Sequence, residues 1–454
     1  MGEARPAPRQ RRFLLKSGLI LAKRKLMEIR DPVHGSIYYS DQEVAVLDTQ
    51  EYQRLRTIKQ LGFSEFSFPG ATHNRYLHSI GVGHLVGQVF DSIFKVYPFS
   101  KPAVGKRLRQ ATRLAALLHD VGHGPLSHTT EQVMPAVADL KVSVYRDPIQ
   151  SGRRANHEDY TIKYVTDSKI ADTIRKHFPD ITPMHVACLI DKTLAAPDDF
   201  FIDQGCDFRP ILSQIVSSEL DADRMDYLER DSYFCGTNYG KIDHEWLIQN
   251  MTFHRIDNKL YLALNRRALY SFDDFLISRH HMHLMVYFHH KSIIYEEMLN
   301  RYLSSADCEF RLPSDISEYT AFNDYKLHEH LSQSTNPWAQ RIAQKRPYRV
   351  LIELHNNTDA SRPEYIKKSL EKEGIDVIWA SSKARLSKYH SGSEEDKAMD
   401  IFVVDQYDRK DKPSPINQST EIFSRYEVAR VIDRLYVSPE NFAIAQKLVA
   451  DRGL

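Results

Sequence analysis

Apolar residues recur three and four positions apart along most of the chain between residues 27 and 340, and strict alternation of apolar and polar residues is scarce there. Residues 112–119 (TRLAALLH) and residues 268–291 show this spacing most clearly. The spacing places apolar side chains on one face of an α-helix, which packs that face against a core. We therefore predict a mainly α fold, in which an all-helical body spans residues 27–340.

The pattern changes after Pro347, where short runs rich in β-branched residues predict strands between helix starts. Ser361 and Glu364 form a capping-box pattern with Pro363 in the first turn, so a helix is expected to begin there. Together these features predict a smaller C-terminal α+β lobe over residues 341–454. The expected strands are residues 348–354, 377–380 and 401–404, and two further helix starts are expected at Ser424 with Glu427 and at residues 438–440.

Composition narrows the class of protein. The 454 residues are 42% hydrophobic, which is enough to bury a sizeable core and argues against a disordered chain. Four scattered cysteines without a CxxC pair argue against a disulfide framework and a cysteine-ligated zinc site. The apolar run at residues 13–22 is interrupted by Lys16, and no segment reaches the length of a membrane-spanning helix. We expect a cytoplasmic protein without a membrane segment.

The charge is unevenly distributed, although the chain as a whole has 61 basic and 60 acidic residues. Residues 1–26 carry several arginines and lysines and only Glu3 as an acid, so they form a basic N-terminal tail. Such a tail suits contact with nucleic acid or a polyanionic surface. A solvated or vector-derived extension explains the tail more simply.

Metal-ligating side chains gather in four short segments of the predicted body, at residues 73–78, 119–128, 156–159 and 221–227. His119 and Asp120 stand at the end of an apolar helical segment and run directly into a glycine-containing loop. Burying an imidazole and a carboxylate side by side at a helix end is costly unless a partner compensates them. A bound cation would supply that compensation.

The segments around these residues resemble the HD-domain phosphohydrolases. The resemblance is closest to the deoxynucleoside triphosphate (dNTP) triphosphohydrolases, which include bacterial dGTPase-like enzymes and vertebrate enzymes with a sterile-alpha-motif domain. No sterile-alpha-motif domain is expected here, because only 26 residues precede the body. The resemblance implies hydrolysis of a dNTP at the α-phosphorus to deoxynucleoside and inorganic triphosphate. The matching segments are DPVHG (31–35), YQRLRTIKQLG (52–62), FPGATHNRYLHSIGVGHL (68–85), LHDVGHGPLSH (118–128) and LDADRMDYLERD (220–231).

The resemblance implies that His78, His119, Asp120 and Asp223 bind one divalent metal ion. Mixed imidazole and carboxylate ligands suit Fe, Mn, Zn or a similar ion. Asp221 competes with Asp223, but helical spacing places Asp223 on the same face as Tyr227 and Asp231, which favours Asp223. Mg²⁺ is expected with the substrate phosphates.

The catalytic residues implied by the resemblance are His123, His128, Glu131 and His157. Cleavage at the α-phosphorus expels a basic alkoxide, so a general acid is needed. Glu131, three residues after His128, would hold that imidazole protonated and oriented. His123 and His157 match residues that contact phosphate or the attacking water.

Substrate contacts are implied along several segments, because a triphosphate needs cations near it. Tyr287 is expected to stack under the deoxyribose and exclude a 2′-hydroxyl, while Asp231 and Gln60 read the 3′-hydroxyl. The full implied set is Gln60, Leu61, Arg75, Arg224, Tyr227, Asp231, Arg279, His283 and Tyr287. Residues 279, 283 and 287 form an i, i+4, i+8 stripe if residues 268–291 are one helix.

The resemblance also implies regulation. Asp48, Gln53 and Arg56 match residues that bind an activating nucleotide, a dNTP or GTP, between subunits of a homo-oligomer, either a dimer or a tetramer. Asp48 and Arg56 lie eight residues apart, so a structural ion-pair surface explains them about as well.

Two alternatives to a dNTP triphosphohydrolase remain. The first is an HD-type phosphodiesterase that acts on cyclic or polymeric nucleotides. The second is a nucleic-acid-binding or regulatory protein with a degenerate site, which predicts missing ligands. No expected ligand is missing, so the basic tail is the only support for that second alternative.

Overall fold

The computed structural model describes residues 26–145, 152–355, 361–384, 401–405, 407, 412–422 and 430–453. Apart from residue 26, the basic tail predicted at residues 1–26 lies outside the described residues. The helix start expected at Ser424 with Glu427 lies outside them too. None of the helices in the described part of the chain is long and apolar enough to cross a membrane.

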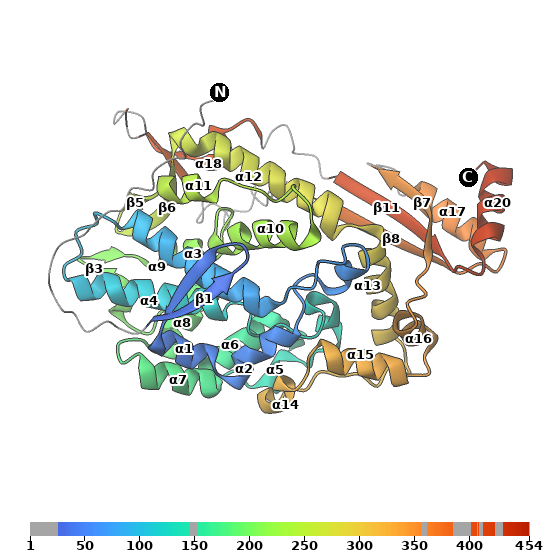
Figure 1. The fold of residues 1–454 in the computed structure, drawn as a ribbon, viewed down its shortest axis with the longest axis horizontal. Coiled ribbons are helices and arrows are strands. Elements are labelled where there is room, and N and C mark those ends of the chain that lie inside the picture. Colours follow the sequence, from blue (N-terminus) through green and yellow to red (C-terminus); the bar gives the residue numbers. More distant parts are fainter. Residues whose placement is uncertain are drawn as a thin grey trace, which may run out of the picture.

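Helices form most of the body, as Figure 1 shows, and the mainly α prediction is confirmed. The two long helices α3 and α4 pack against each other, and α10 packs on α3. The described body helices are α1 (Asp41–Leu47), α2 (Gln50–Gln53), α3 (Arg75–Ile93), α4 (Pro102–Leu118), α5 (Val137–Leu140), α6 (His157–Asp167), α7 (Lys169–His177), α8 (Pro183–Ile190), α9 (Arg209–Val216), α10 (Ala222–Cys235), α11 (His244–Asn250), α12 (Leu269–Met282), α13 (His290–Leu303), α14 (Ile316–Thr320), α15 (Asp324–Gln333) and α16 (Pro337–Ala343).

Side-chain caps fix where the helices around the later site begin. Asn74 accepts the backbone N–H of Leu77 at the start of α3, and Asp221 accepts that of Arg224 at the start of α10. Asn156 forms a capping box at the start of α6. Each cap satisfies an N–H group that the helix itself leaves unpaired. Residues next to these caps are therefore held in place from the first turn.

The body contains strands as well as helices, which corrects the expectation that it is all-helical. β1 (Leu26–Asp31) and β2 (Gly35–Ser40) form an antiparallel hairpin, and β5 (Met251–Ile256) pairs with β6 (Lys259–Asn265) in the same way. Asp257 adopts a left-handed conformation in the two-residue turn between β5 and β6. An Asp-Asn turn between short runs is a hairpin signal. The shorter strands are β3 (Ile202–Asp203) and β4 (Cys206–Asp207).

The segment expected as one helix over residues 268–291 is broken. α12 ends at Met282, a π-helical turn (η7, His283–Tyr287) follows, and α13 begins at His290. A π-turn adds a residue to the turn and so changes the direction of the side chains after it. The regular i, i+4, i+8 stripe expected there is therefore not kept.

The C-terminal part contains a separate three-stranded sheet, at the right-hand end of Figure 1. β11 (Arg430–Val437) lies between β7 (Arg349–His355) and β8 (Val377–Ala384), antiparallel to both. Helices α17 (Ser361–Glu371) and α20 (Phe442–Arg452) cover the sheet with a small hydrophobic core of their own. The strands expected at residues 348–354 and 377–380 and the helix expected to begin at Ser361 are confirmed.

The strand expected at residues 401–404 is also confirmed, but it belongs to a different sheet. β9 (Phe402–Val404) pairs parallel with β6 of the body and antiparallel with β10 (Ser414–Pro415), which leads into α18 (Ile416–Ser419). Residues of the predicted lobe therefore contribute to the body. The division at residue 341 remains a prediction.

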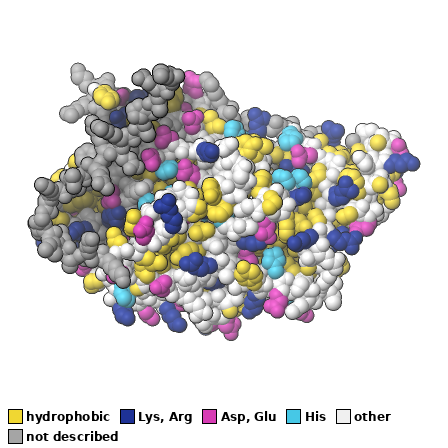
Figure 2. Space-filling model, in the orientation of Figure 1, with side chains coloured by type: hydrophobic (Ala, Val, Ile, Leu, Met, Phe, Trp, Pro, Cys, Tyr) yellow, Lys and Arg dark blue, Asp and Glu magenta, His cyan; other side chains and the backbone are white. Residues whose placement is uncertain are grey.

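On the face in Figure 2, basic and acidic side chains are scattered over the described surface and are not gathered by sign. The four cysteines are all free thiols, as their spacing predicts. They are Cys188, Cys206, Cys235 and Cys308.

Candidate active site

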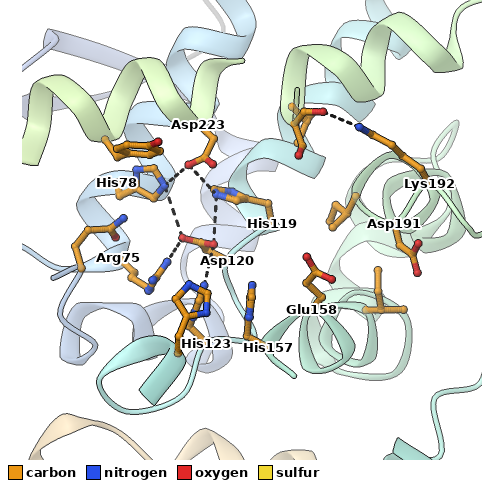
Figure 3. Close-up of a pocket in the computed structure, with 17 residues that line it drawn as sticks. Arg75, His78, His119, Asp120, His123, His157, Glu158, Asp191, Lys192 and Asp223 are labelled. Carbon is orange, nitrogen blue, oxygen red and sulfur yellow. Dashed lines mark hydrogen bonds and ion pairs between the residues drawn. The ribbon is translucent and has the colours of Figure 1, made fainter. Parts of the chain in front are cut away.

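A pocket of about 470 Å³ opens where α3, α6 and α10 converge with the loops after α4 and α8 (Figure 3). Ten of the residues named from the sequence line it, and they come from segments far apart in the chain. They are Gln60, Arg75, His78, His119, Asp120, His123, His128, His157, Asp223 and Tyr227.

Four of these residues, His78, His119, Asp120 and Asp223, face one another and are called the metal cluster below (Figure 3). The Nε2 atom of His78 lies 3.0 Å from Oδ1 of Asp223 and 3.7 Å from Oδ2 of Asp120. The Nε2 atom of His119 lies 3.4 Å from Oδ1 of Asp120 and 3.7 Å from Oδ1 of Asp223. Two imidazoles and two carboxylates thus surround one point in the pocket.

Both imidazoles of the metal cluster are held by their other nitrogen. Nδ1 of His78 donates to Oδ2 of Asp226 at 2.8 Å, and Nδ1 of His119 donates to the carbonyl of Ala116 at 2.7 Å. These bonds leave Nε2 of each ring without a proton in the neutral form, as metal ligation requires. The Nε2 atom of His119 is buried and makes no hydrogen bond within the described residues. A buried atom of this kind is what a metal ion would satisfy, so the donor set fits a divalent cation.

The charges of the metal cluster also favour a cation. Burial would lower the pKa of His78, but the carboxylates of Asp223 and Asp226 raise it to about 10. Burial would raise the pKa of Asp223, but His119 and His78 hold it well below its usual range. The site attracts a proton strongly, and a cation satisfies the same carboxylates.

Asp221, the competing carboxylate, is occupied elsewhere. It is fully buried, caps α10 and pairs with the guanidinium of Arg224. Burial raises the pKa of Asp221 to about 6, and Asp221 does not line the pocket. The arrangement therefore supports Asp223 over Asp221 as a metal ligand.

His123, His128, Glu131 and His157 form a second group next to the metal cluster, called the acid–base cluster below. Oε1 of Glu131 accepts from Nδ1 of His128 at 3.1 Å and from Nδ1 of His157 at 2.6 Å. The rings of His123 and His157 stack with centroids 3.9 Å apart. Burial would raise the pKa of Glu131, but these two imidazoles lower it to about 2. Glu131 therefore remains an ionised acceptor for both imidazoles at neutral pH.

The two clusters are joined through Asp120. Its Oδ1 lies 3.2 Å from Nε2 of His123, and its Oδ2 accepts from Arg75. Burial would raise the pKa of Asp120, but the Arg75 guanidinium and His119 hold it well below its usual range. Arg75 also donates to the hydroxyl of Ser127 at 2.9 Å. One buried arginine therefore fixes the carboxylate between the clusters.

The loop after α4, which carries His119 and Asp120 of the metal cluster and His123 of the acid–base cluster, is packed tightly against α6. A Cβ atom on Gly122 would lie 2.2 Å from the carbonyl oxygen of His157 and 2.3 Å from the N of Thr161. Only a glycine permits this approach of two backbones. The buried guanidinium of Arg54 donates to the carbonyl of His123 at 2.7 Å and fixes the same loop.

Only some of the expected substrate residues line the pocket. Gln60, Arg75 and Tyr227 line the pocket, whereas Leu61, Arg224, Asp231, Arg279, His283 and Tyr287 are not among its lining residues. Asp231 accepts from Tyr287 at 2.8 Å and contacts His73 at 2.7 Å. Asp231 and Tyr287 therefore contact each other outside the pocket lining, and their roles toward a sugar stay predictions.

Two of the expected phosphate ligands are held by acids. Arg224 pairs with Asp221 and donates to the carbonyl of Ser218, and Arg279 pairs with Glu219 at 2.8 Å. The Nδ1 of His283 donates to the carbonyl of Arg279 at 2.8 Å within the π-turn region.

Sequence reasoning missed part of the pocket wall. Asp191, Lys192 and Ser217 line the pocket, and Nζ of Lys192 donates to the carbonyl of Ser217 at 2.7 Å. Glu158, which belongs to the 156–159 segment but received no role from the sequence, lines it too. The sequence feature that could have indicated this wall is the charged pair Asp191-Lys192, which directly follows the apolar end of α8.

The expected regulatory residues lie near one another. Nε of Arg56 donates to Oε1 of Gln53 at 2.7 Å, and the guanidinium lies 3.6 Å from the ring centroid of Tyr76. Among the described residues no ion pair joins Asp48 to Arg56, so the alternative of an ion-pair surface has no support. Whether the three bind a nucleotide stays a prediction.

Comparison with known protein families identifies two regions of the chain. The family described as HD domain matches residues 75–231, and the one described as HD associated region matches residues 242–372. The first range contains all the residues of both clusters.

Comparison with curated proteins finds relatives both with and without an assigned activity. The chain is 33% identical to the uncharacterized protein YwfO of Bacillus subtilis over 61% of this chain and 55% of that protein. It is 26% identical to the deoxynucleoside triphosphate triphosphohydrolase SAMHD1 of Homo sapiens over 83% of this chain and 62% of that protein. It is 27% identical to the deoxynucleoside triphosphate triphosphohydrolase SAMHD1 homolog of Dictyostelium discoideum over 88% of this chain and 71% of that protein. The chain thus spans less than two thirds of the first two relatives.

Solved structures show the same fold. A hypothetical protein from Aquifex aeolicus matches with a TM-score of 0.71 and 23% identity over 94% of this chain and all of that one. A phosphohydrolase from Bacteroides thetaiotaomicron matches with a TM-score of 0.66 and 20% identity, over 91% of this chain and all of that one.

Proposed function

We propose that this chain, an HD-domain protein, is a metal-dependent phosphohydrolase that cleaves dNTPs at the α-phosphorus to deoxynucleoside and inorganic triphosphate. The observation that carries the proposal is that the two clusters adjoin in one pocket, where Asp120 of the metal cluster lies 3.2 Å from His123 of the acid–base cluster. The names of the human and Dictyostelium relatives support the choice of dNTPs as substrates.

The residues proposed to hold the metal ion are His78, His119, Asp120 and Asp223. A divalent cation bound there would neutralise charge on a phosphate oxygen and lower the pKa of a water molecule beside it. The two imidazole ligands are already oriented, because Asp226 and the carbonyl of Ala116 hold the Nδ1 atoms of His78 and His119. Fe, Mn, Zn or a similar ion suits this mixed set, and Mg²⁺ is proposed to accompany the substrate phosphates.

His128 is proposed as the general acid. Its side chain is 68% exposed and stands at the mouth of the pocket, and its Nδ1 is bonded to Glu131. Water adds to the α-phosphorus, the bond from phosphorus to the 5′-oxygen breaks, and the imidazole gives its proton to that oxygen. The proton that water loses passes to solvent. Glu131 and the stacked rings of His123 and His157 keep the imidazole oriented toward the leaving group.

The triphosphate is proposed to bind between Arg75 and Lys192, two basic residues that line the pocket. Arg224, Arg279 and His283 are proposed to join it by exchanging their present partners for phosphate. Gln60 and Asp231 are proposed to read the 3′-hydroxyl, with Leu61, Tyr227 and Tyr287 against the sugar. Exclusion of a 2′-hydroxyl by Tyr287 would favour deoxynucleotides.

Regulation is proposed at Asp48, Gln53 and Arg56, where a dNTP or GTP would bind between subunits of a homo-oligomer. The support is the proximity of Gln53, Arg56 and Tyr76, which offers a hydrogen-bonding and stacking surface for a base. A cytoplasmic location is proposed with it, since dNTP pools and reduced thiols occur there.

The test is product analysis by chromatography. The full chain is incubated with each dNTP alone and in mixtures, with Mn²⁺, Mg²⁺ or chelator, beside ribonucleotide controls. We expect equal amounts of deoxynucleoside and triphosphate, only with metal. Release of pyrophosphate or orthophosphate, or no turnover of any mixture by metal-loaded protein, would contradict the proposal. Turnover of cyclic or oligomeric nucleotides instead would establish the phosphodiesterase alternative.

A further inference from the structure

Besides the metal cluster and the acid–base cluster, a third group of metal-ligating side chains includes a residue further along α10, outside the pocket lining. It consists of His34 in the turn between β1 and β2, Glu229 on α10 and His244 at the start of α11, and is called the outer cluster below. One ligand atom from each residue lies within 4.8 Å of the other two. The rings of His34 and His244 meet edge to face, with centroids 5.9 Å apart. Three segments of the chain thus converge on one point.

His34 is oriented in the same manner as the histidines of the metal cluster. Its Nε2 bonds to Oδ1 of Asp226 at 2.6 Å, and within the described residues its Nδ1 makes no hydrogen bond. Oδ2 of the same Asp226 holds Nδ1 of His78 at 2.8 Å. One buried carboxylate therefore orients an imidazole of each cluster, and carboxylate–histidine pairs of this kind are typical partners of metal ligands.

Buried ion pairs and hydrogen bonds also hold the backbone of the turn that carries His34. Arg230 donates to both oxygens of Asp226 at 2.8 Å and to Asp31 at 2.9 Å, and all three side chains are fully buried. Asp31 in turn accepts the backbone N–H groups of Val33 and His34. The turn that carries His34 is therefore locked onto α10 before any ligand binds.

The accessibility of the outer cluster suits a bound ion. The side chains of His244 and Glu229 are 22% and 17% exposed, whereas that of His34 is 2% exposed. Oε1 of Glu229 lies 3.0 Å from Nδ1 of His244. A simple ion pair explains these two residues, but it does not explain the buried third imidazole beside them. Bonds of about 2.0–2.2 Å from zinc to nitrogen and oxygen would draw the three atoms together with small side-chain rotations.

We propose that His34, Glu229 and His244 bind a second divalent transition-metal ion, with Zn²⁺ as the ion that this ligand set suits best. Two imidazoles and one carboxylate are a common zinc ligand set, with one position left for water. The ion would join the turn between β1 and β2 to α10 and α11. Because Asp226 touches both clusters, it also connects this ion to the orientation of His78. The site stands whether or not the protein hydrolyses dNTPs.

The test counts metal ions in the full chain. Protein stripped with chelator is saturated with Zn²⁺ alone, desalted and measured by inductively coupled plasma mass spectrometry. We expect two equivalents for the wild type, one for His244→Ala and one for His119→Ala. Glu245→Ala, which removes an exposed acid next to His244 on α11, is the matched control and keeps two equivalents.

A single equivalent in the wild type that His244→Ala leaves unchanged would overturn the proposal. If circular dichroism shows that His244→Ala does not fold, Glu229→Gln decides in its place, with the same loss of one equivalent expected. Two equivalents in that folded variant would also overturn the proposal. Metal counts are independent of turnover, so failure of the dNTP assay and failure of this site are distinguishable.

Discussion

The two clusters that share the pocket hold their histidines in different ways. In the metal cluster, His78 is 1% exposed and His119 is 14% exposed, and each ring is anchored through Nδ1. In the acid–base cluster, His128 is 68% exposed and its contacts are Glu131 and two neighbouring rings. One cluster is assembled before a ligand arrives, and the other keeps a histidine open to the solvent.

This difference matches the two kinds of work proposed for them. A cation is bound more tightly when neighbouring groups already orient its ligands. A proton donor instead has to reach the leaving group and then recover its proton from solvent. Burial and anchoring therefore distinguish the histidines proposed as metal ligands from the histidine proposed as the acid, although all of them lie in the same pocket.

The largest effect is expected from removing a ligand of the metal cluster. His119→Ala should lose both the bound metal and detectable turnover, because the remaining ligands no longer surround the ion. Metal content and dNTP turnover are measured on the same sample. His281→Ala, which removes an exposed histidine of α12, should change neither. Full turnover by metal-free His119→Ala protein would show that the metal cluster is not needed for the reaction, so the proposed difference between the two clusters would be wrong.

A smaller effect is expected in the acid–base cluster. His128→Ala should slow turnover roughly 10²–10⁴-fold, because the 5′-oxygen must then leave without its proton donor. Metal content should stay at the wild-type value, since His128 touches none of the metal cluster. Loss of metal in this variant would show that His128 is a ligand.

Glu131→Gln should have a smaller effect again. The variant keeps the size of the side chain but loses a charged acceptor shared by His128 and His157. A charged hydrogen bond contributes about 1.5–3 kcal/mol, so we expect turnover to fall roughly 10- to 100-fold. Steady-state kinetics at saturating substrate measures this fall. A loss as large as that of His128→Ala would mean that Glu131 itself transfers the proton.

The smallest effect is expected from adding a methyl group at Gly122, where the loop after α4 packs against α6. Gly122→Ala forces a Cβ into the backbone of His157 and Thr161, and overpacking of this kind costs roughly 1–3 kcal/mol in the free energy of unfolding. Chemical denaturation measures it. Gly152→Ala is the control, because nothing lies within 4 Å of its added Cβ. Equal stabilities of the two variants would show that the loop moves freely relative to α6.

The sequence predicted local features well. The spacing of apolar residues indicated the helical body, and β-branched runs indicated β7, β8 and β9. The His119-Asp120 pair at the end of an apolar helix indicated a buried polar site, because its burial needs a partner. Each of these features depends on residues within a turn or two of one another.

Features that depend on distant residues could not be predicted in the same way. Asp226 orients His34, which lies 192 residues before it, and no spacing rule relates such positions. The pairing of β9 with β6 and the place of Lys192 in the pocket wall depend likewise on how segments pack. The β5–β6 hairpin and the π-turn at residues 283–287 were missed for another reason, because each is a local exception inside a helical context.

The central claim is that the metal cluster supports attack at phosphorus while His128 protonates the leaving group. It is tested most directly by comparing a dNTP with the 4-nitrophenyl ester of triphosphate, in which nitrophenolate replaces the nucleoside 5′-oxygen as the leaving group and departs without a proton. We expect His128→Ala to lose roughly 10²–10⁴-fold on the dNTP and less than about tenfold on the ester, whereas His119→Ala loses both activities. Equal losses by His128→Ala on the two substrates would contradict the account.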